Sequence, residues 1–332
     1  MILCDVHSEG EKSKSARACN AKKTRPRTLK CGHAGGAGRR ALVRAAIMAF
    51  SSSVLLSGCS LVPIRRKLPV PKAPEVVETV TPHELVARLN HRWDALQTLT
   101  VTVEIQATEL KTKEGVAETL PESDGWILLR KPSMLRVTGN YLGMRAIDMV
   151  GNGKTFTLEI PMKNLAIEGS YTSKEKSQNP LYNLRPGFFF SAIFVEGLGP
   201  EDHYSVIADT ETAEDAAKKH LLSVPEYILN IARLKPGSSE MNEVRVITFH
   251  REDLLPYKQD IYDDQGNLQS EVRYRKYWNF GSVRYPSAIT IRCPLADAEI
   301  TLAVSKVKEN VKLPDSKFQL HLPPGIKIQH LN

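Results

Sequence analysis

Cys59 is the residue whose surroundings point most directly to chemistry in this sequence of 332 residues. It follows the apolar run 45–56 and two small residues, and three arginines precede that run. A basic stretch, roughly 7–15 apolar residues and small residues before a cleavage point are typical of a secretory signal, whereas a transmembrane helix needs about 20 apolar residues. The pattern therefore predicts export, with Cys59 either at the cleavage point or incidental to it.

The four residues that end at Cys59 read LSGC and resemble the bacterial lipobox. In that motif the cysteine is acylated and becomes the first residue of the mature chain after cleavage on its amino side. The resemblance implies that residues 1–58 are a signal peptide and that Cys59 is a lipid anchor. The amino-terminal region of this signal peptide is over-long, which a start codon assigned too early would explain.

Other reactive side chains lack the spacing that catalysis or metal binding needs. After residue 58 the sequence has no GxSxG, HExxH, Walker or dinucleotide-binding motif. The carboxylates of YDDQGN, residues 262–267, lack the spacing of a calcium loop and fit a hairpin turn. The histidines are dispersed, and the cysteines before residue 58 lack the CxxC spacing of a zinc site. We therefore expect no catalytic residue, no metal and no cofactor, and hence no enzyme.

The basic excess of the chain lies in residues 1–58. These residues hold 11 of the 45 lysines and arginines and 3 of the 37 aspartates and glutamates, which leaves 34 of each sign in the predicted mature chain. A neutral domain gives no support to nucleic-acid binding. Only Cys59 and Cys293 remain after cleavage, so acylation of Cys59 would leave no intramolecular disulfide.

Residues 59–80 are predicted to be the anchor and a tether. Four prolines and several basic residues favour an extended, semi-rigid spacer over packed structure. Arg65, Arg66 and Lys67 lie near the anchor and either contact anionic headgroups or belong to a solvated tether. The remaining residues, 81–332, are enough for one sizeable domain.

Hydrophobic periodicity predicts a mainly β domain of the α+β class. Thr81, Pro82 and Glu84 have the spacing of a helix start with a capping box, and apolar residues at helical spacing follow. From residue 99 the period changes to two, and short alternating segments separated by turn signals recur along the chain. We expect a curved antiparallel sheet or incompletely closed β-barrel with the amphipathic helix on its concave side. The polar segment 212–220 is predicted to be an exposed loop or short helix.

One central segment, residues 179–199, interrupts the β pattern. It concentrates large apolar side chains, namely Phe188, Phe189, Phe190, Ile193 and Phe194. These rings must be buried, either as a helix that plugs the sheet or as a lid over an apolar cavity. Composition alone does not separate the two.

The order of these parts, from lipobox and tether through helix and strands to the carboxyl end FQLHLPPGIKI, resembles the LolA/LolB superfamily. Those proteins handle bacterial lipoproteins with an open barrel whose apolar interior holds acyl chains. The resemblance implies such a barrel and cavity within residues 81–332. The side chains expected to line the cavity are Val101, Val103, Leu135, Val137, Phe156 and Leu158, with Phe188, Phe189 and Ile193 as lid or plug.

A lipid anchor suggests the LolB-like, outer-membrane form of the superfamily. LolB-like proteins carry a turn between two early strands whose leucine projects into solvent and helps to place cargo in the membrane. Here the segment RVTGNYLGMRAIDM offers Tyr141, Leu142, Gly143 and Met144 as a membrane-insertion loop. The alternative is an ordinary hairpin whose leucine folds back onto the barrel.

The resemblance implies a lipid-anchored envelope protein that binds acyl chains and passes them to a membrane without catalysis. Its expected partners are acylated lipoproteins or other lipids, a soluble LolA-like carrier and the membrane surface, and its expected location is the periplasmic face of the bacterial outer membrane. The alternative is a non-enzymatic assembly or stress-sensing lipoprotein with the same fold and a filled cavity.

Overall fold

The computed structural model describes residues 70–331, apart from residues 112–113, 172, 174–182, 184 and 216–219. Leu68–Asn332 forms one compact unit. The predicted signal peptide, the anchor Cys59 and the basic residues 65–67 lie outside the described residues. Their roles stay predictions.

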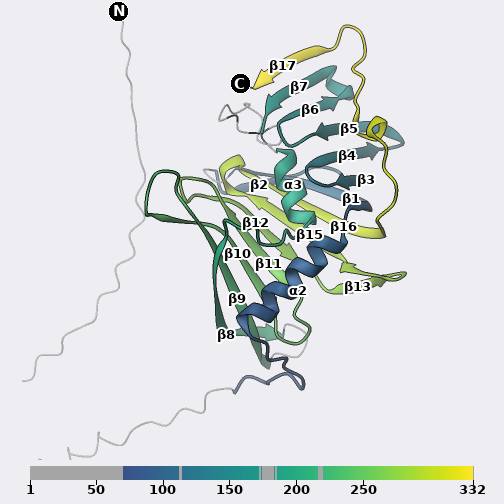
Figure 1. Ribbon diagram of the computed structural model, residues 1–332. Helices are drawn as coiled ribbons and strands as arrows, with labels where there is room; N and C mark the ends of the chain where they lie inside the picture. Colours follow the sequence, from purple (N-terminus) through teal and green to yellow (C-terminus); the bar gives the residue numbers. More distant parts are fainter. Residues whose placement is uncertain are drawn as a thin grey trace, which may run out of the picture. The chain divides into compact units, whose positions relative to one another are not determined.

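A large curved sheet dominates this unit, and it does not close into a barrel (Figure 1). Its strands are β1 (Thr98–Lys111), β2 (Val116–Thr119), β3 (Ser123–Arg130), β4 (Met134–Tyr141), β5 (Met144–Gly151), β6 (Thr155–Ile160), β7 (Leu165–Ser170), β8 (His203–Asp215), β9 (His220–Leu234), β10 (Met241–His250), β11 (Pro256–Tyr262), β12 (Leu268–Tyr274), β15 (Ala288–Cys293), β16 (Ala298–Glu309) and β17 (Lys327–Leu331). The main path runs β17-β7-β6-β5-β4-β3-β1-β16-β15-β12-β11-β10-β9-β8, and β2 pairs with β1 beside it. A separate two-stranded sheet consists of β13 (Tyr277–Phe280) and β14 (Val283–Pro286). The predicted mainly β, incompletely closed architecture is therefore confirmed.

The sheet differs from a purely antiparallel meander at one edge. Strand β17 pairs with β7 in parallel, so the sheet is mixed. The parallel pairing arises because the chain does not turn back after β16. It first crosses the sheet and then adds β17 to the edge strand β7. No local sequence pattern indicates such a long-range pairing.

The prediction of a loop or short helix for residues 212–220 is wrong in part. Residues 212–215 continue β8, and His220 begins β9. Strand β8 is an edge strand whose described residues are nearly all exposed on both faces. A strand that is exposed to solvent on both faces needs no alternation of apolar and polar residues, so its sequence did not indicate a strand.

Helix α2 (Pro82–Ala95) begins as predicted. The Thr81 side chain accepts a hydrogen bond from the amide of Glu84, and the Glu84 carboxylate accepts one from the amide of Thr81, which completes the capping box. The helix buries Leu85 and Leu89 in a core that they share with strands β9 and β10. It therefore covers the concave side of that half of the sheet, as expected.

Helix α3 (Pro186–Ile193) lies on the same side, in the middle of the concave surface (Figure 1). The last carbonyls of a helix lack partners within it, and here side chains of β11, β12 and β14 supply donors. Gln259 donates to the carbonyl of Ser191 at 2.9 Å. The hydroxyl groups of Tyr274 and Tyr285 donate to the next two carbonyls, at 2.8 and 3.1 Å. The aromatic segment is thus fixed to the strands by hydrogen bonds as well as by burial.

A carboxyl-terminal strap, residues 310–326, connects β16 to β17 across the outer face of β3 and β4. Arg130 of β3 donates to the carbonyl of Leu313 at 2.7 Å, and Arg136 of β4 donates to the carbonyl of Lys317 at 3.0 Å. Phe318 of the strap is buried, and the Arg130 guanidinium lies 5.0 Å from the centroid of its ring. The strap therefore covers the outer face in the part of the sheet that holds the β4–β5 hairpin.

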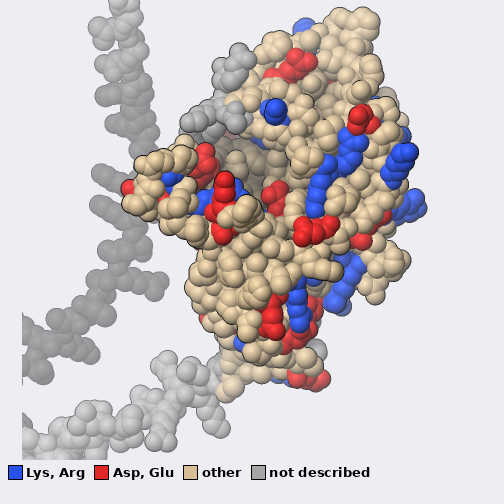
Figure 2. All heavy atoms as spheres, in the orientation of Figure 1, with Lys and Arg blue, Asp and Glu red and all other residues tan. Residues whose placement is uncertain are grey.

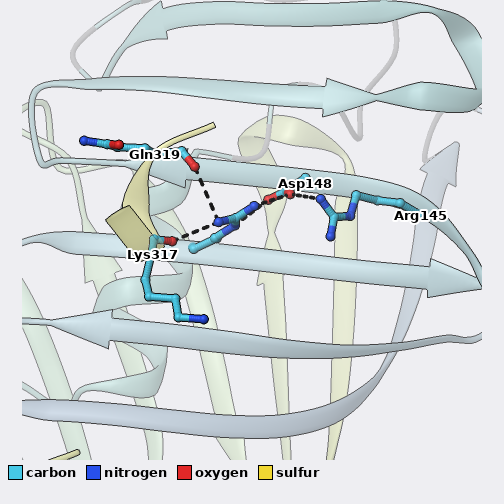
Figure 3. A network of polar contacts seen from close by, with 5 residues as sticks. Arg145, Asp148, Lys317 and Gln319 are labelled. Atoms are coloured by element: carbon cyan, nitrogen blue, oxygen red, sulfur yellow. Dashed lines mark hydrogen bonds and ion pairs between the residues drawn. The ribbon is translucent and has the colours of Figure 1, made fainter. Parts of the chain in front are cut away.

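The strap and this hairpin meet at Asp148, whose side chain is fully buried (Figure 3). Its carboxylate accepts hydrogen bonds from Arg136 Nε and Nη2, at 2.9 and 2.7 Å, and from Arg145 Nη1 at 2.7 Å. Hydrogen bonding to Asp148 raises the pKa of Arg136 above its usual value. Two arginines thus share one buried carboxylate, and Arg136 also links this carboxylate to the strap through its hydrogen bond to the carbonyl of Lys317.

Candidate functional site

An apolar cavity of about 460 Å³ lies between the concave face of the sheet and α3. Strands β1 and β3–β6 supply most of its wall, and α3 contributes Phe189. Its principal apolar residues are Val137, Ile147, Met149, Leu158, Ile160 and Phe189. The wall is apolar because every second side chain of a strand points to the same face of the sheet, and the apolar residues of these strands occupy the positions that point to the concave face.

The charged members of the cavity lining, Glu109, Glu118 and Lys163, come from strand ends and turns at one end of the sheet. The register places the carboxyl end of β1 beside the start of β16 and the start of β3 beside the end of β4. The polar border of the cavity therefore lies at the end of the sheet that also carries the β4–β5 turn.

The residues predicted to line an acyl cavity are all buried in the core on this face. Val137 and Leu158 line the cavity directly. Val101, Val103 and Phe156 belong to the surrounding core, as does Leu135, and none of these four is among the described lining residues. Their role in binding a ligand stays a prediction.

The predicted lid or plug residues lie on α3 and differ in what they contact. Phe189 lines the apolar cavity, whereas Ile193 lines a second cavity at the other end of the helix. Phe188 is half-buried against the same core. The helix thus occupies the middle of the concavity and leaves space at both of its ends.

The predicted membrane-insertion loop is the two-residue turn between β4 and β5, with Tyr141 ending β4. Leu142 and Gly143 both have positive φ, 50° and 78°, as a type I′ hairpin requires. Leu142 is 80% exposed and Met144 58%. The alternative in which the leucine folds back onto the sheet is therefore wrong, while membrane insertion stays a prediction.

Other turns at this end of the sheet expose apolar side chains as well. They are Leu120 before β3, Met162 in the β6–β7 turn and Leu295 in the β15–β16 turn. The β3–β4 and β5–β6 turns at the opposite end, residues 131–133 and 152–154, contain no large apolar residue apart from Pro132. The apolar turns thus lie at the same end as the polar border of the cavity, a relation that only the strand register reveals.

The buried thiol of Cys293 and the possible metal ligands are the remaining reactive groups. Burial raises the pKa of the Cys293 thiol to about 12, so it stays protonated. Residues 70–331, with the gaps given above, contain no group of three or more His, Cys, Asp or Glu side chains placed to hold a metal. No helix within those same residues is both long and apolar enough to cross a membrane. Acidic and basic side chains are interspersed over the face in Figure 2.

A second cavity, of about 790 Å³, lies between α2, the end of α3 and the β13–β14 hairpin. Sequence reasoning missed it, because its walls come from segments far apart in the chain. The interleaved aromatic and basic residues of RYRKYW, residues 273–278, were a signal that could have indicated part of it.

Comparison with known proteins finds matches among solved structures only at low sequence identity. No protein-family model matches the sequence, and no curated protein matches it. A DUF1329 family protein from Desulfovibrio piger is 15% identical with a TM-score of 0.47, over 71% of this chain and 95% of that one. A LolA superfamily protein from Nitrosomonas europaea is 15% identical with a TM-score of 0.45, over 73% and 99%.

A third solved structure is provisionally named as an outer membrane lipoprotein-sorting protein domain and comes from Vibrio parahaemolyticus. It is 10% identical with a TM-score of 0.42, over 71% of this chain and 94% of that one. One of the three solved structures is thus described by the name of the superfamily that the sequence resembles.

Proposed function

We propose that this chain is a lipid-anchored protein of a bacterial envelope that binds acyl chains in the apolar cavity and passes them to a membrane without catalysis. The observation that carries this proposal is the cavity itself, with its volume of about 460 Å³ and its predominantly apolar lining. Pockets for small molecules typically have roughly 300–1,000 Å³. An acyl chain matches the chemistry of this lining better than a polar ligand does.

Burial of an acyl chain supplies enough free energy to hold the cargo. Each buried CH₂ contributes about 0.8 kcal/mol, so a chain of about 12 such groups gains on the order of 10 kcal/mol. Release into water is therefore strongly unfavourable, whereas transfer to a second apolar cavity or to a bilayer preserves the burial. Such a hand-over needs neither nucleotide nor catalytic residue.

The proposed setting follows from the anchor and the turns. An acylated Cys59 would keep the domain beside a bilayer, on the periplasmic face of the outer membrane. The cargo would be acylated lipoproteins or other lipids, delivered by a soluble LolA-like carrier. Leu142 and Met144, exposed at the end of the sheet where the cavity has its polar border, would enter the leaflet.

A second candidate function is favoured by the packing of α3. Phe189, Phe190 and Phe194 are all buried, and side chains of β11, β12 and β14 donate hydrogen bonds to the last carbonyls of the helix. If this packing leaves no room for a ligand in solution, the same fold would act as a non-enzymatic assembly or stress-sensing protein.

Lipid extraction from the purified compact unit, residues 68–332, distinguishes the two candidates. We expect mass spectrometry to find acyl lipid at near-stoichiometric amounts after gentle purification from bacterial cells. An empty protein that also fails to bind a fluorescent fatty acid would contradict the carrier function and support the second candidate.

A matched pair of variants on β1 makes this experiment specific to the cavity. Ala107 lines the cavity, and a tryptophan there would fill it, so Ala107→Trp should remove most of the lipid. Glu104 lies on the exposed face of the same strand, and Glu104→Trp should leave the lipid content unchanged.

A further inference from the structure

The second cavity is large enough for a ligand, and one side of it, called the aromatic floor below, consists of aromatic rings. Tyr274, Tyr277 and Tyr285 line it, and each hydroxyl group already donates to a backbone carbonyl at 2.8–3.1 Å. These hydrogen bonds hold the rings in place. Trp93 of α2 and Phe194 at the end of α3 add two more rings, packed edge to face with centroids 5.8 Å apart.

Basic side chains surround this floor. Arg88, Arg92 and Arg284 line the cavity, and Glu309 is the one acidic side chain among its described lining residues. The acids that pair with Arg88 and Arg284 are Glu78 and Asp253, at 3.0 and 2.9 Å. These two ion pairs neutralise Arg88 and Arg284, which leaves Arg92 as the arginine of the lining that makes no ion pair within the described residues.

Arg92 is the cation best placed to receive a ligand. Within the described residues its guanidinium makes no hydrogen bond or ion pair with another side chain. The positive charge of Arg92 acts on Glu309. Burial raises the pKa of the Glu309 carboxyl, and Arg92 offsets part of that rise. A guanidinium offers five donors in a rigid fork that matches a phosphate or carboxylate.

We propose that this cavity is a second binding site, specific for an anionic amphiphile whose phosphate or carboxylate head lies at Arg92 and whose apolar part lies on the aromatic floor. The site is separate from the apolar cavity, since Phe189 lines that cavity and Ile193 and Phe194 line this one. It does not depend on acyl-chain binding under the other end of α3. An apolar floor with a cationic border selects an amphiphile over either a neutral lipid or a free anion.

Titration calorimetry of the full chain with dodecyl phosphate, below its micelle concentration, tests this proposal. We expect saturable binding that Arg92→Gln weakens by about tenfold, because a charge-assisted hydrogen bond is lost. Arg275→Gln, an exposed arginine just outside the cavity, is the matched control and should have no effect. Dodecyl maltoside, which has the same chain and a neutral head, should bind both proteins equally.

Two further arms separate this site from the apolar cavity and from a simple anion site. Ala107→Trp fills the apolar cavity and should leave the Arg92-dependent binding intact, so loss of acyl lipid and loss of this site are distinguishable. Inorganic phosphate should bind far more weakly than dodecyl phosphate. The proposal would be overturned if dodecyl phosphate did not bind, or if it bound the wild type and Arg92→Gln equally. It would also be overturned if Ala107→Trp lost the binding of dodecyl phosphate, or if inorganic phosphate bound as tightly as dodecyl phosphate. Arg92→Met, which removes the same charge, repeats the test if Arg92→Gln fails to fold.

Discussion

The buried carboxylate of Asp148 is the single side chain on which the outer face of the β4–β5 hairpin most depends. Its removal would leave Arg136, which is itself mostly buried, without its hydrogen-bonded counter-charge and with only the electrostatic influence of Glu159 on the next strand. Loss of one partner from a buried ion pair costs about 3–5 kcal/mol. We expect Asp148→Ala to lower the free energy of unfolding by that amount in urea denaturation.

Arg145 provides the control, because its side chain is more exposed and it is one of two partners of the carboxylate. Exposed ion pairs contribute about 1 kcal/mol or less. Arg145→Gln should therefore have a small effect. Equal effects of the two substitutions would show that the network does not tie the strap to the hairpin.

At the scale of elements, α3 is held in the concavity by hydroxyl groups of β12 in the large sheet and of β14 in the separate hairpin. Tyr274→Phe and Tyr285→Phe would each leave a buried carbonyl of α3 without its donor. An unsatisfied buried polar group costs about 1–3 kcal/mol. We expect both variants to lower stability by that amount and to speed hydrogen exchange of the amides of residues 189–194, which together would report a loosened helix.

Tyr204→Phe on the exposed edge strand β8 should change neither quantity, since that side chain is 41% exposed. Faster exchange throughout the domain in the Tyr274→Phe variant, without a larger effect in α3, would argue against a specific role of the hydroxyl groups in fixing this helix.

The elements also differ in how far the sequence reveals them. The start of α2 is predictable because the capping box and the proline at residue 82 act locally. Strands β1 and β6 are predictable because one face of each is buried. The parallel pairing of β17 is not, because a strap of several residues separates it from its nearest strand in the chain. The 790 Å³ cavity is also not predictable from the sequence, because α2 and the β13–β14 hairpin come together only in the folded chain.

At the scale of the whole molecule, the two ends of the sheet differ in chemistry. One end exposes Leu142 and Met162 in its turns and borders the apolar cavity. The other end exposes Trp278 in the β13–β14 hairpin and Val311, at 39%, just after β16, and it borders the second cavity with its arginines. A domain that delivers acyl chains to a bilayer should face it with the end that borders its cavity, because the chain then need not cross water.

Vesicle binding by the compact unit Leu68–Asn332, which lacks Cys59, tests this orientation. Full burial of a Leu or Met side chain gains about 1.5–3 kcal/mol, so partial insertion of one such residue is worth about a tenfold change in partitioning. Leu142→Glu and Met162→Glu should each weaken binding to phosphatidylethanolamine–phosphatidylglycerol vesicles by about that factor. Urea midpoints should stay unchanged, since both side chains are exposed. Val311→Glu adds the same charge at the opposite end and should leave binding intact. An equal loss in all three variants would mean that the anionic surface repels any added carboxylate, and no loss in Leu142→Glu or Met162→Glu would mean that this end of the sheet does not face the membrane.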